Sequence, residues 1–407
     1  SRNIEKAVGN RGQMRIPYLN ISVIKKHKIL IAHLSLCYAS VLVFPVFGPV
    51  LKRVTDEKSS MIISSWALLI LILSFVVKPM EKENKKIYFA LLAGISSICA
   101  LAFPYASLTL KMVLITPFVF TVGRTAVFWS RRFLKQVPRN EMGRVISIVL
   151  FISYGILYLG NVLVPSLSPL PAVLISTLLI SSSIAIKYRY LSTGDIDCIN
   201  KNTMRDKNEK YSVWLFMAVI IFIYITAGIT YTSIYPGLQV YSTLERYFNV
   251  LPFVLVVTLA GMIADFKGRK RLLYIGVSSL GISFIFFSMG QSILRYFITQ
   301  ITLQAGWAFL DAYVWIAAAD IAINRKKPQI QAYGVAMFLV GTNIGTVIVL
   351  FMKDMLETND LLYRLVTYLP LFVVISILSL LPETLKPKEM DHSQVLLNKD
   401  IFSSLTP

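Results

Sequence analysis

The chain has 407 residues, of which 56% are hydrophobic and only 15% are charged, and its mean hydropathy is +0.65. A soluble protein of this length carries far more surface charge, so the composition excludes that class and favours a membrane protein. The formal net charge of +20 does not indicate a nucleic-acid partner, because the basic residues alternate along the chain with apolar blocks instead of gathering in one patch.

The apolar blocks are long enough to cross a bilayer, for which a helix needs about 20 residues. We expect about twelve spans, all of them helices, because a backbone exposed to lipid must satisfy its hydrogen bonds within its own segment. In chain order the spans cover residues 28–51, 59–78, 86–107, 110–130, 144–166, 169–188, 212–235, 247–265, 271–290, 295–322, 330–352 and 361–382.

The loops between the spans differ strongly in their basic residues. With the N-terminus placed in the cytoplasm, the inside segments carry 32 lysines and arginines and the outside segments carry 8. Because positive charge gathers on the cytoplasmic side, we expect a multi-pass protein of the cell membrane with both termini in the cytoplasm.

A polar, mixed-charge connector at residues 191–211 divides the spans into six and six, and it has the composition of a flexible linker. The expected fold class is therefore an all-α integral membrane protein made of two six-helix bundles. The expected order is a cytoplasmic segment (1–27), the first bundle (28–190), the linker (191–211), the second bundle (212–384) and a cytoplasmic tail (385–407).

The loop between the eighth and ninth spans has the sequence Gly-Met-Ile-Ala-Asp-Phe-Lys-Gly-Arg-Lys. It resembles the cytoplasmic loop motif of the major facilitator superfamily, Gly-x-x-x-Asp-x-x-Gly-Arg-Lys. All five fixed positions are filled, by Gly261, Asp265, Gly268, Arg269 and Lys270. The alternative, a basic loop that only sets topology and contains a chance aspartate, explains neither the five matches nor the flanking spans.

The resemblance implies two six-helix bundles around a central cavity, and secondary transport of a small solute by alternating access, with proton coupling as an option. In the superfamily this aspartate holds the cytoplasmic side closed, together with basic partners and the N-terminus of a neighbouring helix. Here that helix is expected to be the span after Pro328. Gly261 would let two helices approach closely, Gly268 would permit a tight turn, and Asp265 is placed to pair with Arg269.

The corresponding loop of the first half, residues 78–86, is basic but lacks the Gly-x-x-x-Asp frame. This departure leaves an alternative open, a transporter-derived sensor or receptor that binds a solute without moving it. An enzyme is not expected, because three histidines, two of them outside the spans, supply no catalytic constellation. No ATP-binding pattern, cofactor or metal site is expected either.

Ionisable residues inside spans are costly and usually face a cavity or a partner. Arg124, in the fourth span, could bind an anionic group, or it could be an ion-paired or interfacial arginine. Asp311, in the middle of the tenth span, could bind a proton or a cationic solute, or it could be a hydrogen-bonded structural carboxyl. His33 could take part in the site or lie at the membrane interface. Asp320 is expected to pair with Arg325.

Polar and aromatic side chains in the spans complete the candidate set. Trp307, Asn161 and Asn343 could line the cavity, although an aromatic residue more often packs in the core, and an asparagine often joins two helices. Tyr38, Tyr154, Tyr224 and Gln304 could line it as well. The expected partners are a small solute, protons and the lipid bilayer, around a monomer.

Overall fold

The computed structural model describes residues 21–190 and 213–359, except residues 47, 78–84, 239–243, 245, 246, 290 and 291, together with single residues between 365 and 376. All regular structure in this described part is helical. The prediction of an all-α fold is therefore confirmed.

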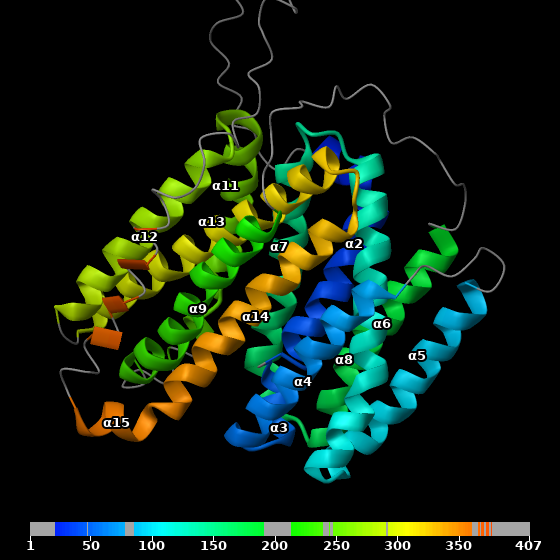
Figure 1. Cartoon of the computed structure of the whole chain (residues 1–407), viewed down its shortest axis with the longest axis horizontal. Coiled ribbons are helices and arrows are strands. Elements are labelled where there is room, and N and C mark those ends of the chain that lie inside the picture. The colour runs from blue at the N-terminus through cyan, green and yellow to red at the C-terminus, as the bar shows by residue number, and fades with distance from the viewer. Residues whose placement is uncertain are drawn as a thin grey trace, which may run out of the picture.

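The helices fall into two groups along the chain (Figure 1). The first group is α2 (Ile21–Val43), α3 (Pro49–Val54), α4 (Glu57–Val76), α5 (Lys85–Ala102), α6 (Leu108–Gln136), α7 (Met142–Leu163) and α8 (Pro169–Tyr190). The second group is α9 (Val213–Leu238), α11 (Leu251–Lys267), α12 (Lys270–Ser288), α13 (Ile293–Asn324), α14 (Gln329–Phe351) and α15 (Lys353–Thr358).

Eleven of the expected spans coincide with a helix, and the twelfth, 361–382, lies mostly outside the described residues. Nine of the described helices are long and apolar enough to cross a membrane. The first span was placed too late, because α2 begins at Ile21 and carries its lysines as part of the helix. It also ends early, at Val43, where Pro45 and Pro49 interrupt the pattern and a separate short helix, α3, follows.

Local sequence explains several helix ends. Asp56 caps α4, because its carboxylate accepts a hydrogen bond of 2.9 Å from the backbone N–H of Ser59. Ser292 caps α13 in the same way, through the backbone N–H of Arg295. The Ser292 cap sets where the long buried helix α13 begins, and α13 carries much of the candidate site.

The two groups lie side by side, and α13 runs through the interior with most of its side chains buried (Figure 1). Two contacts between the groups correspond to each other: α7 packs against α11, and α4 packs against α14. In each pair the fifth long helix of one group meets the second of the other, which is the pattern of a duplicated fold. The expected bundle and linker boundaries stay a prediction, because residues 191–211 lie outside the described part.

We call the end of the molecule where α2 begins and α11 ends the basic end. Lys26, Arg139, Arg144 and Arg269 lie there. It is the upper end in Figure 1.

Candidate functional site

Asp311 lies in the middle of α13 and is 3% exposed. Its two carboxylate oxygens accept one hydrogen bond each, from the Tyr154 hydroxyl at 2.7 Å and from the Tyr224 hydroxyl at 2.5 Å. Tyr154 belongs to α7 in the first group, whereas Tyr224 belongs to α9 in the second. The carboxylate is therefore held by both groups of helices at once.

Aromatic rings surround this carboxylate. The Tyr38 ring meets the Tyr154 ring edge-on at 6.2 Å between centroids, and the Trp307 ring lies 5.8 Å from Tyr224 and 6.2 Å from Tyr231. We call Asp311, Tyr38, Tyr154, Tyr224, Tyr231 and Trp307 the central cluster. On its margins, Phe253 stacks on Tyr154 at 3.8 Å.

Two polar atoms of the central cluster have no hydrogen-bond partner of normal geometry among the described residues. They are the hydroxyl of Tyr38, with Tyr154 and Trp315 as near neighbours, and Nε1 of Trp307. Both side chains are nearly fully buried. Buried polar groups are normally paired, so atoms left over in this way are available to a bound molecule.

One ring of the central cluster is partly exposed. Tyr231 is 37% exposed, although its ring stacks against Trp307, which is only 2% exposed.

A second constellation joins the two groups at the basic end. Asp265, in the last turn of α11, accepts hydrogen bonds from the backbone N–H groups of Gly143 at 2.8 Å and Arg144 at 3.0 Å. The Arg144 guanidinium adds an ion pair at 3.0 Å. Asp265 therefore binds the N-terminus of α7, where the helix dipole and the unsatisfied N–H groups favour an anion.

The expected partner helix for Asp265 was wrong, since the N-terminus that it binds belongs to α7 and not to the helix after Pro328. The cause is a close approach of α7 and α11 through facing glycines. A Cβ on Gly261 would lie 2.4 Å from the carbonyl oxygen of Gly143, so only glycine fits this contact. Gly268 ends α11 with φ +88°, a turn that favours glycine.

Three charged groups complete the basic end. Asp320, near the end of α13, accepts a hydrogen bond of 3.0 Å from Nε of Arg139 and contacts Nη1 of Arg269. Arg269 also donates to the Arg139 carbonyl oxygen at 3.3 Å. Arg269 thus pairs with Asp320, whereas the local partner expected for it was Asp265. We call Gly143, Arg144, Asp265, Arg139, Arg269 and Asp320 the basic-end cluster; Lys270 lies outside it, over the Tyr274 ring at 5.6 Å.

Arg124 joins two helices of the first group. It lies on α6, and its Nη1 donates to the carbonyl oxygens of Ser74 at 3.2 Å and Val77 at 2.5 Å. These carbonyls are at the C-terminal end of α4, where the last turn of a helix leaves acceptors unsatisfied. Arg124 therefore fastens α6 to the end of α4 within the first group.

The other candidates also join helices. His33 is fully buried, and its Nδ1 lies 2.9 Å from the Ser183 hydroxyl and carbonyl oxygens on α8. Asn343 donates from Nδ2 to the Ser65 hydroxyl at 2.9 Å, which links α14 to α4 of the other group. Asn161 is only partly buried near the end of α7.

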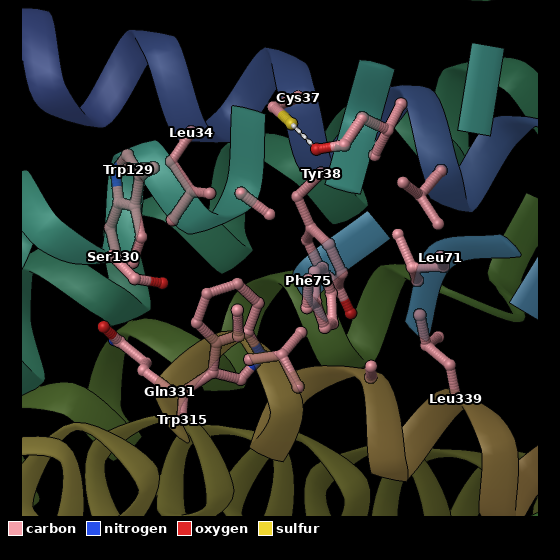
Figure 2. Close-up of a pocket in the computed structure, with 16 residues that line it drawn as sticks. Leu34, Cys37, Tyr38, Leu71, Phe75, Trp129, Ser130, Trp315, Gln331 and Leu339 are labelled. Atoms are coloured by element: carbon pink, nitrogen blue, oxygen red, sulfur yellow. Dashed lines mark hydrogen bonds between the residues drawn. The ribbon is translucent and has the colours of Figure 1, made fainter. Parts of the chain in front are cut away.

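Figure 2 shows a pocket between the groups, with Tyr38 and Trp315 among the residues that line it. Its walls come from α2, α4 and α6 on one side and from α13 and α14 on the other. Leu71, Phe75 and Leu339 make much of the wall apolar, while Ser130 and Gln331 lie together at one end. The Gln331 amide is fully buried, and neither of its polar atoms has a partner among the described residues.

Some residues of the candidate site could not be singled out from the sequence. Tyr231 and Phe253 gave no signal that separates them from other aromatic residues in spans. In the sequence, Arg139 and Arg144 stood out only as two of the basic residues that set the topology.

Solved structures provide the comparison. The chain is similar to a bacterial homologue of the iron transporter ferroportin in an outward-facing state, with a TM-score of 0.61 at 12% identity, covering 87% of this chain and 97% of that one. It is also similar to the human organic anion transporter MFSD10 (TETRAN), with a TM-score of 0.59 at 11% identity, covering 86% of this chain and 99% of that one. No protein-family model matches the sequence, and no curated protein matches it significantly.

The likeness establishes the fold. The chain has the fold of the major facilitator superfamily transporters, a multi-pass arrangement of membrane helices, as the loop motif at Gly261–Lys270 predicted.

Proposed function

We propose that the chain is a secondary transporter that moves a small solute by alternating access around the central cluster. The observation that carries this proposal is the position of Asp311, whose two oxygens are bound by one tyrosine from each group of helices. A site shared in this way changes its geometry when the groups rock against each other, which is the motion that alternating access requires. The membrane fold shared with the compared transporters supports the same proposal.

The basic-end cluster supplies the closed gate of the proposed cycle. Asp265 binds the first turn of α7 and Asp320 binds Arg139 in the loop before it, so the contacts of the cluster cross between the groups. With the basic end in the cytoplasm, as the charge of the loops indicates, the molecule is closed on the cytoplasmic side. The ferroportin homologue is described as outward-facing, which agrees with this interpretation.

The exit route that we propose runs through the pocket in Figure 2. Its walls come from both groups, so it would widen when the basic-end cluster separates. The Tyr38 and Trp315 rings, 5.1 Å apart between centroids, both line the pocket, and Tyr38 also belongs to the central cluster. They would then separate a solute at Asp311 from the cytoplasmic side in the closed state.

Asp311 is also our proposed site for a coupling proton. A carboxyl in a membrane interior is costly when ionised and exchanges a proton with the help of nearby hydroxyls. The solutes that appear in the names of the compared proteins, iron for the ferroportin that one of them is a homologue of and organic anions for the other, are not carried over, because those proteins share the fold at 11–12% identity.

Flux in proteoliposomes tests this function. An inward proton gradient is imposed, an internal dye reports pH, and small acids, amines, sugars and drugs are added in turn. A solute-dependent pH change that a protonophore abolishes, that empty liposomes lack and that Asp311→Asn removes is the expected result. Solute binding without any flux, either dye-reported or of the labelled solute, would instead establish the sensor alternative.

A further inference from the structure

We propose that the solute is an organic monocation that is bound between the Asp311 carboxylate and the aromatic rings of Tyr231, Trp307 and Tyr224. This inference rests on the proposed function, since it names the class of solute that the central cluster accepts.

The first argument is charge. Both hydrogen bonds to Asp311 come from neutral hydroxyl groups, and no basic side chain among the described residues pairs with its carboxylate. The buried arginine of the neighbouring helix α6, Arg124, donates to the end of α4 instead. A buried carboxylate without a cationic partner is costly, and a positively charged ligand supplies that partner.

The second argument is the nature of the walls. Cations without strongly held water bind over the faces of tryptophan and tyrosine rings. Trp307 lies within stacking distance of Tyr231 and close to Tyr224, whose hydroxyl binds Asp311. A hard metal ion would need several oxygen ligands, whereas the cluster offers one carboxylate among rings, and the described residues contain no group of three His, Cys, Asp or Glu that could hold a metal ion.

The third argument is the access that a ligand has to the cluster and the hydrogen-bonding capacity that its polar atoms still offer. Each Asp311 oxygen accepts one hydrogen bond, which leaves further acceptor capacity on both. Tyr231 provides the exposed edge over which a ligand can enter. The unpaired Nε1 of Trp307 is a donor, so a solute with a hydroxyl or carbonyl acceptor beside its cationic group would satisfy it.

Equilibrium binding to the purified full chain tests the inference, with radiolabelled 1-methyl-4-phenylpyridinium as the tracer. The competitors are unlabelled tracer, neutral 4-phenylpyridine kept above neutral pH, and the anion biphenyl-4-carboxylate, which have similar flat shapes and different charges. We expect saturable binding of the cation, at least about tenfold weaker competition by the neutral compound, and none by the anion.

Variants locate the site. Asp311→Asn should weaken tracer binding by at least about tenfold, while Asp311→Glu, which keeps the charge, should retain part of it. Tyr231→Ala should weaken binding about two- to fivefold, and Tyr231→Phe should not, because the ring and not the hydroxyl is the contact. Asp56→Asn removes a carboxylate at the exposed cap of α4 and is the matched control. Size-exclusion profiles confirm that each variant is folded.

The outcomes separate the inference from the function on which it rests. Equal binding of the neutral compound, competition by the anion, or full binding by Asp311→Asn would overturn the cation inference, even if proteoliposomes carry another solute through Asp311. Binding that meets every criterion without any flux of the tracer would support the cation site and overturn transport.

Discussion

The Asp265 carboxylate lies 2.8 Å from the backbone nitrogen of Gly143, a residue 122 positions earlier in the chain. This contact joins the last turn of α11 to the first turn of α7, and Asp265 is only 2% exposed there. Since the two helices belong to different groups, this one carboxylate ties the groups together at the basic end.

Neutralising Asp265 should open the basic end. In Asp265→Asn the ion pair with Arg144 is lost and the hydrogen bonds to the start of α7 are no longer charge-assisted, which costs about 1.5–3 kcal/mol of the closed state. We expect the open population to rise by roughly tenfold or more. Spin labels at Gln136 and Lys327, both exposed and on different groups, report the change as a longer distance distribution.

The labels require a background in which Cys37, Cys99 and Cys198 are replaced. Asp56→Asn is the control for a lost carboxylate, because Asp56 lies at the opposite end of the first group. An unchanged distance distribution in Asp265→Asn would show that the carboxylate does not hold the closed state.

A methyl group added at the α7–α11 contact should lower the stability of the protein, whereas one added elsewhere on α7 should raise it. In Gly143→Ala the new Cβ would lie 2.5 Å from the Gly261 carbonyl oxygen and 2.6 Å from Asp265 Oδ1, so we expect a loss of about 1–3 kcal/mol. In Gly155→Ala the Cβ meets nothing within 4 Å, and the gain in helix propensity should add up to about 1 kcal/mol. Thermal unfolding in detergent compares the melting temperatures of the two variants. Similar changes in melting temperature for both would contradict the close packing of α7 against α11.

Arg124 should matter for stability and not for solute binding. Arg124→Ala leaves the carbonyl oxygens of Ser74 and Val77 without their charged donor, which should lower the unfolding free energy by about 1.5–3 kcal/mol. Denaturation in detergent measures the loss, and tracer affinity is measured on the same preparation. If tracer affinity falls by more than the loss of folded protein explains, Arg124 belongs to the solute site and this prediction is wrong.

Glu141 gives the basic end a dependence on pH. It accepts hydrogen bonds from Lys26 at 2.9 and 3.1 Å and lies 2.9 Å from His27 Nε2. Desolvation alone would raise the pKa of Glu141, but the hydrogen bonds from His27 and Lys26 and the charge of Lys26 outweigh it and lower that pKa.

A lowered pKa means that the folded state favours the ionised form of Glu141. Its contribution to stability is therefore complete above the pKa of an unfolded glutamate and is lost as pH falls through the folded value. We expect the melting temperature of the unchanged chain to fall as the pH is lowered from about 5 to about 3. The melting temperature of Glu141→Gln should be lower at about pH 5 and should fall less over the same range. Parallel curves of melting temperature against pH for the two proteins would show that Glu141 contributes nothing to the pH dependence of stability.

The membrane helices could be predicted because apolar length alone determines them, whereas their ends could not. The lysines near residue 25 looked like the end of a span, yet a helix continues through charged residues once they lie in water. The motif placed Asp265 correctly at the end of a helix, but no local pattern could name Gly143 as its partner, since that contact depends on how two distant helices pack.

In the central cluster, too, one residue could be predicted from the sequence and its partners could not. Asp311 could be singled out because a carboxyl in the middle of an apolar span is conspicuous. The chain has 20 tyrosines, and selecting Tyr154 and Tyr224 as its partners depends on the rotation of each helix about its own axis. Hydropathy does not contain that rotation when a helix is apolar on all sides.

Asp311 and Asp320 lie on one continuous helix, nine residues apart. Nine residues correspond to about 13.5 Å along the helix axis and to roughly two and a half turns, so the two carboxylates point to opposite sides. α13 is buried over most of its length, and close packing leaves little freedom for it to bend locally. It can therefore act as a lever: a tilt that follows the arrival or departure of charge at Asp311 also displaces Asp320 from Arg139, without any relay of side chains between them.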